Sequence, residues 1–207
     1  MQKKFSGTAV ILAGGQGRRM QGESKAFLQI GGVSILDRLE AVLEPLFSEI
    51  ILVVKSKEQL KKGVSGFKVI LDQYPDQSAM AGIHAGLLAA ITERIFVVAC
   101  DMPFLQPEVV QKIWTTDDAV GIVVPQWRKQ YQPLCATYRK ICLPQIASLI
   151  HQKNFKLENL FSKETIKVIS MKEIEAIDPQ GKSFININRP KDLEMAQRIM
   201  EEAARVH

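Results

Sequence analysis

The chain has 207 residues, 46% of them hydrophobic and 24% charged, which is the composition of an ordinary globular protein, and its formal net charge is +5. We expect one domain over residues 1–207, and no apolar stretch approaches the roughly 18 residues that a membrane helix needs. The basic residues are scattered, which disfavours a nucleic-acid partner and suits an anionic small molecule, although a merely solvated surface explains the total charge equally well.

The N-terminal segment and the cysteines indicate a cytoplasmic protein. Residues 1–7 are basic, but the apolar run that follows is only about five residues long, too short for a signal peptide. The three cysteines, Cys100, Cys135 and Cys142, lack a C-x-x-C spacing, which argues against a disulfide framework or a zinc site. Cys100 lies in an apolar run and is interpreted as a small buried residue.

Strands and helices alternate in the first half of the chain. The predicted strands are apolar and rich in β-branched residues, Ser34 can cap one helix, and Pro107 suits the first turn of another. We expect strands at 8–12, 49–54, 67–71 and 95–100, and helices at 34–43, 57–62, 79–92 and 106–114. This alternation predicts right-handed crossovers between parallel strands.

The second half is less regular. We expect strands at 121–125, 134–138 and 166–169, and helices at 140–151, 157–161 and 192–205, the first of these interrupted near its start by Pro144. Residues 184–188 alternate apolar and polar side chains, as a strand does. The whole pattern predicts an α/β fold with three layers, in which helices cover both faces of a doubly wound, mostly parallel, Rossmann-like sheet.

A glycine-rich, basic loop follows the first predicted strand, at residues 12–25. Its glycines let backbone N–H groups converge on an anion, and Arg18, Arg19 and Lys25 add full positive charges. The spacing fits neither the P-loop, whose Lys-Ser/Thr is missing, nor the dinucleotide fingerprint, whose third glycine is missing. We therefore predict a phosphate-binding loop, with a flexible basic surface loop as the alternative.

Two aspartates follow predicted strands that end at the same edge of the sheet. Asp72 comes after the strand at 67–71, and Asp101 comes after the strand at 95–100. Because ligands bind at the carboxyl ends of parallel strands, we expect Gly14, Asp72 and Asp101 to line one crevice. Asp101 would be well placed there to hold Mg²⁺ with phosphates and water. The alternative is a helix cap or turn residue at Asp101 and a turn residue at Asp72.

The sequence contains no evident pairing of a nucleophile with a base. Its three histidines, His84, His151 and His207, have no metal-ligand spacing. A reaction whose nucleophile is already a phosphate needs no general base, because a phosphate monoester is mostly dianionic at neutral pH. Such a reaction needs positioning and charge neutralisation, which backbone amides, lysine and Mg²⁺ supply.

Four motifs together resemble the molybdenum cofactor guanylyltransferases of the nucleoside-triphosphate transferase superfamily, and the resemblance runs over nearly the whole chain. Residues 12–25 resemble the superfamily's signature loop, and residues 100–105 resemble the family's Cys-Asp-x-Pro-Phe segment. Residues 132–138 resemble its Gln-Pro-Leu-x-Ala-x-Tyr strand, and residues 184–193 resemble its Asn-x-Asn-Thr-Pro-x-Asp-Leu stretch. The last two motifs point to this member of the superfamily.

The resemblance implies a nucleotidyltransferase fold and a reaction. GMP would pass from GTP to the phosphate of molybdopterin, with Mg²⁺ as cofactor and pyrophosphate as the second product. The implied roles are GTP binding by Leu12, Ala13, Gly14 and Gly15, phosphate binding by Lys25, nucleoside binding by Asp72, Mg²⁺ and nucleotide binding by Asp101, catalysis by Lys25, Asp101 and Arg19, and a position toward the pterin for Gln132, Asn186 and Asn188.

Departures from the family pattern leave other functions open. Residues 53–56 lack an asparagine that contacts the nucleotide in some members, and residues 78–82 keep only the last two positions of a Gly-Pro-Leu-Ala-Gly segment. The alternatives are a transferase that uses CTP or a sugar 1-phosphate, and a non-catalytic nucleotide-binding module. The resemblance also implies transient contact with cofactor-assembly proteins or molybdoenzyme chaperones, and no contact with nucleic acid or membrane.

Overall fold

The structure, a computed structural model, describes residues 4–14, 25–56, 60, 64, 66–72, 74, 78–117 and 119–205. Gly15 and Arg19 of the predicted phosphate loop lie outside these ranges, and so does most of the helix predicted at 57–62.

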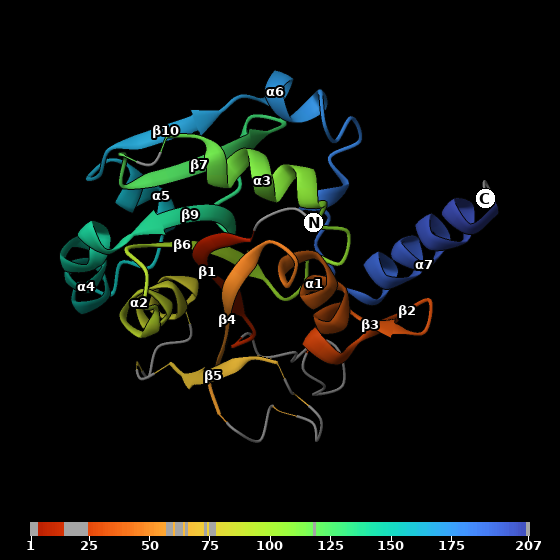
Figure 1. Cartoon of the computed structure of the whole chain (residues 1–207), viewed down its shortest axis with the longest axis horizontal. Coiled ribbons are helices and arrows are strands. Elements are labelled where there is room, and N and C mark those ends of the chain that lie inside the picture. The colour runs from red at the N-terminus through yellow and green to blue at the C-terminus, as the bar shows by residue number, and fades with distance from the viewer. Residues whose placement is uncertain are drawn as a thin grey trace.

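Eight strands of the described chain form one twisted sheet (Figure 1). Their bounds are β1 Phe5–Leu12, β4 Phe47–Val54, β5 Lys68–Leu71, β6 Arg94–Ala99, β7 Ile122–Trp127, β8 Gln130–Tyr131, β9 Cys135–Arg139 and β10 Ile166–Ile169. The order across the sheet is β10-β7-β9-β6-β1-β4-β5, and β8 pairs with β7 as a hairpin. Two short strands, β2 Gln29–Ile30 and β3 Val33–Ser34, form a separate hairpin.

Most neighbouring strands run parallel. β1 lies between β4 and β6 and is parallel to both, β4 is parallel to β5, and β10 is parallel to β7. β9 is antiparallel to both of its neighbours, β6 and β7. The predicted mostly parallel α/β sheet is therefore confirmed, and the carboxyl ends of β1, β4, β5 and β6 share one edge.

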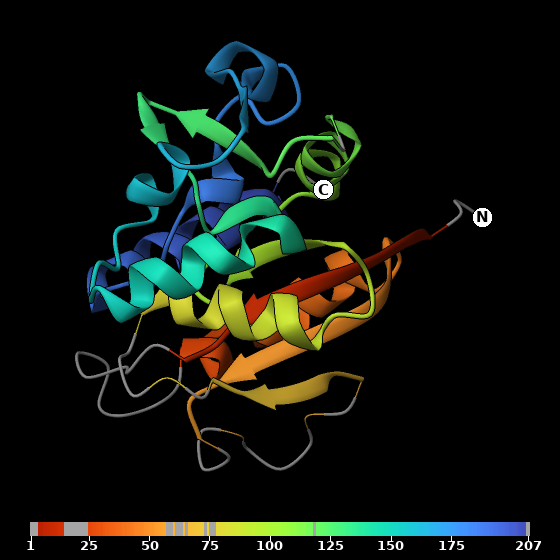
Figure 2. The ribbon, with the colours of Figure 1, turned by 90° about the vertical axis from the view of Figure 1, so that its left-hand side faces the viewer.

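Helices cover both faces of the sheet. Their bounds are α1 Ile35–Leu43, α2 Ala79–Ala89, α3 Pro107–Thr115, α4 Leu143–His151, α5 Leu157–Phe161, α6 Met171–Glu175 and α7 Pro190–Arg205, with the 3₁₀ turns η1 Lys25–Phe27, η3 Lys140–Cys142 and η4 Lys182–Phe184. Figure 2 shows α2 and α4 side by side on one face. α7 extends away from the body past β2 (Figure 1).

Strand β1 separates two hydrophobic cores. Ala9 and Ile11 pack on the side that contains α1 and α3, whereas Val10 packs on the side that contains α2 and α4. All three side chains are fully buried, as the pleat of a strand covered on both faces requires. The apolar strands thus hold the three predicted layers together.

Two glycines let α2 lie close to β1. A Cβ atom at Gly86 would be 2.8 Å from Val10 Cγ1, and one at Gly82 would be 3.0 Å from Leu12 Cδ2. The distance at Gly86 is too short for a real Cβ, and the one at Gly82 would require Leu12 to shift by a few tenths of an ångström, so the absence of side chains here permits the close approach. The approach places the first turn of α2 beside the carboxyl end of β1.

The strand predicted at 184–188 is wrong. Phe184 ends the 3₁₀ turn η4, and residues 185–188 have no regular secondary structure. The N–H of Ile187 donates to the carbonyl of Asp101 over 2.9 Å instead of joining a ladder. The stretch predicted as a helix at 140–151 is divided near its start, as expected: η3 covers Lys140–Cys142, and α4 begins at Leu143 with Pro144 in its first turn.

None of the helices in the described part of the chain combines the length and the apolar character needed to cross a bilayer.

Candidate functional site

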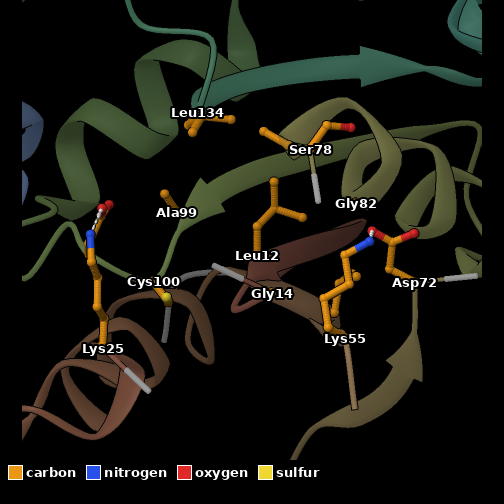
Figure 3. A pocket seen from close by; sticks show the side chains of 13 residues that line it. Leu12, Gly14, Lys25, Lys55, Asp72, Ser78, Gly82, Ala99, Cys100 and Leu134 are labelled. Atoms are coloured by element: carbon orange, nitrogen blue, oxygen red, sulfur yellow. Dashed lines mark hydrogen bonds and ion pairs between the residues drawn. The ribbon is translucent and has the colours of Figure 1, made fainter. Parts of the chain in front are cut away.

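A cavity of about 240 Å³ opens at the carboxyl ends of the central parallel strands (Figure 3). Gly14 follows β1, Asp72 follows β5, and Asp101 follows β6, and all three line the cavity. The crevice expected from strand order is therefore present. The complete lining is Leu12, Gly14, Lys25, Val53, Lys55, Asp72, Ser78, Ala79, Gly82, Ala99, Cys100, Asp101 and Leu134.

Lys25 and Asp101 meet at one end of the cavity. Lys25 Nζ lies 3.1 Å from Asp101 Oδ2 and donates over 2.5 Å to Asn188 Oδ1. Both side chains of the ion pair are mostly buried, with 16% and 17% of their surface exposed. The backbone fixes this corner as well, because Cys100 N donates to Leu12 O and thereby joins the ends of β6 and β1.

The second carboxylate oxygen of Asp101 is unsatisfied. Its Oδ1 atom is buried and has no hydrogen-bond partner among the described residues. A buried anionic oxygen without a donor is costly, and it is the hard ligand that Mg²⁺ prefers. Within the described ranges no group of three or more His, Cys, Asp or Glu side chains gathers into a metal cage, so phosphates and water would complete such a site.

Lys55 and Asp72 form a second ion pair on the opposite side of the cavity (Figure 3). Lys55 Nζ lies 2.7 Å from Asp72 Oδ2 and donates over 2.8 Å to Tyr74 O. The remaining oxygen, Asp72 Oδ1, accepts from Tyr74 N over 3.0 Å. Both oxygens of Asp72 are thus engaged, unlike those of Asp101. The stem of Lys55 packs against Gly14, where a Cβ would lie 3.2 Å from Lys55 Cγ.

The N-terminus of α2 also reaches the cavity. Ser78 caps the helix, since its Oγ accepts from Ala81 N over 3.1 Å, and both Ser78 and Ala79 line the cavity. The positive end of the helix dipole therefore faces the same space as the two lysines. This arrangement favours an anionic ligand.

Cys100 and His84 offer no base or nucleophile to the cavity. Burial raises the pKa of the Cys100 thiol to about 12, so the thiol is neutral near pH 7 and does not act as a nucleophile. His84 does not line this cavity, and its ring packs edge-on against Tyr74. Burial lowers the pKa of His84, which keeps the ring neutral.

Some residues predicted for the site do not line the cavity. Ala13 is buried, and its N–H donates to Val53 O. Gln132 bonds to Gln130 O, and Asn186 bonds to Phe184 O. Asn188 reaches the cavity only through Lys25. Gly15 and Arg19 lie outside the described residues, so their roles stay predictions.

Lys55 is the site residue that the sequence interpretation missed. It lies directly after β4, and the register pairs Val54 of β4 with Leu71 of β5. The next residues along the two strands, Lys55 and Asp72, are therefore neighbours. An opposite-charge pair directly after two adjacent predicted strands is the signal that could have identified it.

Family comparison agrees with this geometry. The model of the family described as "MobA-like NTP transferase domain" matches residues 9–167. The chain belongs to this family. As a MobA-like NTP transferase it is a nucleotidyltransferase, which confirms the enzyme class and the family that the motifs predicted.

Relatives of this MobA-like NTP transferase match it over most of their length. The molybdenum cofactor guanylyltransferase of Desulfosudis oleivorans is 34% identical, over 92% of this chain and 94% of the relative. The crystal structure of molybdopterin-guanine dinucleotide biosynthesis protein A from Archaeoglobus fulgidus is 25% identical, with a TM-score of 0.81 over 94% and 99% of the two chains. Rv0371c from Mycobacterium tuberculosis, crystallised in complex with manganese, shares the fold at 16% identity, with a TM-score of 0.69 over 93% and 98%.

Proposed function

We propose that this MobA-like NTP transferase transfers GMP from GTP to the phosphate of molybdopterin and forms the molybdopterin guanine dinucleotide. The names of its relatives, at 34% identity over most of the chain, support this choice of substrates. The observation that carries the proposal is the corner in which Lys25 pairs with one oxygen of Asp101 while the other, buried oxygen has no described partner. Such a corner suits a triphosphate with a divalent cation.

The reaction is a displacement at phosphorus. An oxygen of the molybdopterin phosphate attacks the α-phosphorus of GTP in line, the bond from that phosphorus to the β-phosphate oxygen breaks, and pyrophosphate leaves. The acceptor phosphate is already an anion near neutral pH, so the chain needs no general base. The neutral Cys100 and the absence of His84 from the cavity lining are consistent with this.

Lys25 stabilises the triphosphate in this proposal. An ammonium group has three N–H donors, and Asp101 and Asn188 account for two of them among the described residues. A further donor can reach a phosphate oxygen and offset the charge that develops on the leaving pyrophosphate. Gly14, the start of α2 at Ser78 and the predicted glycine loop add backbone amides and a positive helix end around the same anion.

Asp101 is the residue that would hold Mg²⁺, through the oxygen that lacks a described partner. When bound, Mg²⁺ neutralises part of the charge on the phosphates. Asp72 is assigned to nucleoside binding, and because Lys55 and Tyr74 occupy both of its oxygens, it would contribute through the pair that it forms with Lys55. Gln132, Asn186 and Asn188 are assigned to the pterin side.

We also infer that residues 1–207 form a single domain and that the protein acts in the cytoplasm. Transient contact with cofactor-assembly proteins or molybdoenzyme chaperones, which would deliver the acceptor and take the product, belongs to the same proposal.

Pyrophosphate release tests the proposed function. The purified protein is assayed with GTP or CTP, with molybdopterin or a sugar 1-phosphate, and with and without Mg²⁺. We expect release only with GTP, molybdopterin and Mg²⁺ together. Release of pyrophosphate with CTP and molybdopterin, but not with GTP and molybdopterin, would replace the guanylyl assignment. Nucleotide binding without release for every acceptor would identify a non-catalytic binding module instead.

A further inference from the structure

Asp178, a buried carboxylate away from the cavity, lies in the loop after α6 and is hydrogen-bonded to the segment before α3. Asp178 is 1% exposed, and the ion pairs found among the described residues do not include it. Its Oδ1 accepts from Lys182 N over 2.9 Å and from Gln106 Nε2 over 3.2 Å, and its Oδ2 accepts from Ser183 N over 2.8 Å. Burying a charge is costly, so three N–H donors on one carboxylate make a tightly specified contact.

Gln106 is the partner that joins the two loops. It is the residue before α3, yet its side chain makes no capping bond to that helix and reaches Asp178 instead. Its own N–H donates over 3.1 Å to the hydroxyl of the fully buried Ser183. Gln106 therefore holds the loop after Asp178 through both its backbone and its side chain.

The same two segments meet a second time at the catalytic corner. Ile187 N donates over 2.9 Å to the carbonyl of Asp101. Gln106 lies five residues after Asp101, and Ile187 lies four residues after Ser183. The 101–106 segment is thus fastened to the 183–187 segment at both ends. Because neither residues 101–106 nor residues 185–188 form a helix or strand, these bonds set their relative position.

The hydrogen bonds between these two segments control the positions of the two acceptors around Lys25. Asp101 belongs to the first segment, Asn188 directly follows the second, and both accept hydrogen bonds from Lys25 Nζ. Gly181, two residues before the second segment, packs directly against Trp127. Its φ is +62°, and a Cβ there would overlap the ring of Trp127 at 2.2 Å.

We propose that Asp178 and Gln106 are positioning residues, which set the separation of Asp101 and Asn188 and thereby fix the ammonium of Lys25. This inference rests on the proposed function only for the effect on turnover. Its structural part, the coupling of Asp178 to the contact between Ile187 and Asp101, stands independently.

Two variants and two independent measurements test the proposal. Asp178→Asn keeps the shape but turns an acceptor into a donor, whereas Gln106→Leu removes one donor at a half-buried position and serves if Asp178→Asn does not fold. Thr8→Val is the matched control. Thr8 is fully buried in β1, is hydrogen-bonded to Glu49 and Thr92, and does not line the cavity.

Hydrogen exchange at the amide of Ile187 is the first measurement, and it needs no substrate. We expect Asp178→Asn to speed this exchange at least about tenfold relative to amides in the middle of α4, because the segment that carries it is released. Thr8→Val should not change the ratio. Unchanged protection of Ile187 in both test variants overturns the proposal.

Turnover in a double-mutant cycle is the second measurement. We expect Asp178→Asn to lower kcat with GTP and molybdopterin about tenfold, since small misplacements of catalytic groups are costly. In an Asn188→Ala background the same change should have less than about a twofold effect, because the residue that it positions is gone. If Asp178→Asn lowers kcat by the same factor with and without Asn188→Ala, its role is merely structural and the proposal is overturned.

Failure of the proposed function gives a different result. If the native protein releases no pyrophosphate with any acceptor, the same cycle is read from the dissociation constant of GTP in the presence of Mg²⁺. If the effects of Asp178→Asn and Asn188→Ala on the free energy of GTP binding are non-additive, and exchange at Ile187 is faster, positioning of Lys25 is still supported. Additive effects refute it.

Discussion

Lys25 and Asn188 lie 163 positions apart in the chain, and the ammonium of the first donates to the side-chain oxygen of the second over 2.5 Å. The contact joins the end of the glycine-rich loop to the segment before the last helix. Asn188 of the C-terminal motif thus lies in the same corner as Lys25, the last residue of the predicted phosphate loop. Changes at either end of the chain should affect the same step.

Removal of the Lys25 charge tests this corner directly. We expect Lys25→Met to lower kcat about tenfold to a hundredfold, as the loss of one electrostatic group at a transition state typically does, and Asn188→Ala to lower it about tenfold. Lys68→Met is the control, because Lys68 begins β5 and pairs with Glu49 away from the cavity. Near-normal kcat in Lys25→Met would contradict its assigned role.

Asp101→Ala removes the oxygen proposed for Mg²⁺. We expect kcat to fall by at least about tenfold to a hundredfold, and the Mg²⁺ concentration needed for half-maximal activity to rise, because the chain's proposed ligand is lost. Titration of Mg²⁺ under saturating GTP measures both effects. Turnover close to that of the native protein would exclude Asp101 as the metal ligand.

The buried pair of Lys55 and Asp72 should control stability. The side chain of Asp72 is 3% exposed, so Lys55→Met would leave a buried charge, and we expect a loss of about 3 kcal/mol in the free energy of unfolding. Lys55→Met combined with Asp72→Leu should recover most of that loss.

Urea unfolding of the single and double variants measures this coupling. The exposed pair of Lys4 and Glu44 provides the comparison, since Lys4→Met should cost less than about 1 kcal/mol. Equal effects at the two lysines would mean that burial does not strengthen the Lys55 contact.

Gly86 should not tolerate a side chain. A helix normally gains about 1 kcal/mol from Gly→Ala, but here the new Cβ would lie 2.8 Å from Val10 Cγ1, and overpacking costs about 1–3 kcal/mol. We expect Gly86→Ala to destabilise the protein, and Val10→Ala to cost less in that background than alone. A stabilised Gly86→Ala variant would show that α2 can move away from β1.

Replacement of the turn between β7 and β8 should stabilise the folded protein. Arg128 and Lys129 have φ angles of 47° and 65°, a left-handed conformation that Asn-Gly adopts far more readily. We expect the Asn-Gly replacement to raise the free energy of unfolding by about 1–2 kcal/mol. Arg128→Ala with Lys129→Ala removes the same charges but keeps the β-carbons, and it should not stabilise the fold.

The contribution of Glu173 should depend on pH. Hydrogen bonds from the Ser170 backbone, and next from Lys112, lower the pKa of Glu173 from 4.5 to about 2. A carboxylate with a lowered pKa stabilises the folded state fully above pH 4.5, and this stabilisation is lost as the pH falls toward 2. We expect Glu173→Ala to lower Tm at pH 7 by about 1–3 °C and to have little effect near pH 2.

Thermal unfolding of Glu173→Ala and Lys112→Met over this pH range separates the helix cap from the ion pair. The cap predicts a larger effect for Glu173→Ala, because Lys112 contributes only the exposed contact. A difference in Tm that does not change with pH would rule out ionisation of Glu173 as the cause.

The sequence predicts the cavity well because the cavity depends mainly on topology. Gly14, Asp72 and Asp101 each follow a parallel strand, and the carboxyl ends of such strands share one edge whatever the side chains between them. Lys55 follows β4 in the same way, but its pairing with Asp72 depends on the register of β4 against β5, which the sequence does not state.

Local patterns account for the errors. Residues 184–188 alternate in polarity, yet Phe184 and Ile187 are the buried ones, a spacing of three that no strand has. Helix α6 was missed, although Ser170 and Glu173 form a capping box that can be read from the sequence. The network around Asp178 could not be inferred, since its partner Gln106 is far away in the chain.

The three thiols give the protein a built-in reporter of its own unfolding. Cys100, Cys135 and Cys142 are all buried, and burial raises the pKa of each. A maleimide or similar alkylating reagent should therefore leave Cys135 and Cys142, which do not line the cavity, unmodified in the native protein, and should label them only when the chain opens. The rate of labelling then measures that opening with no engineered probe.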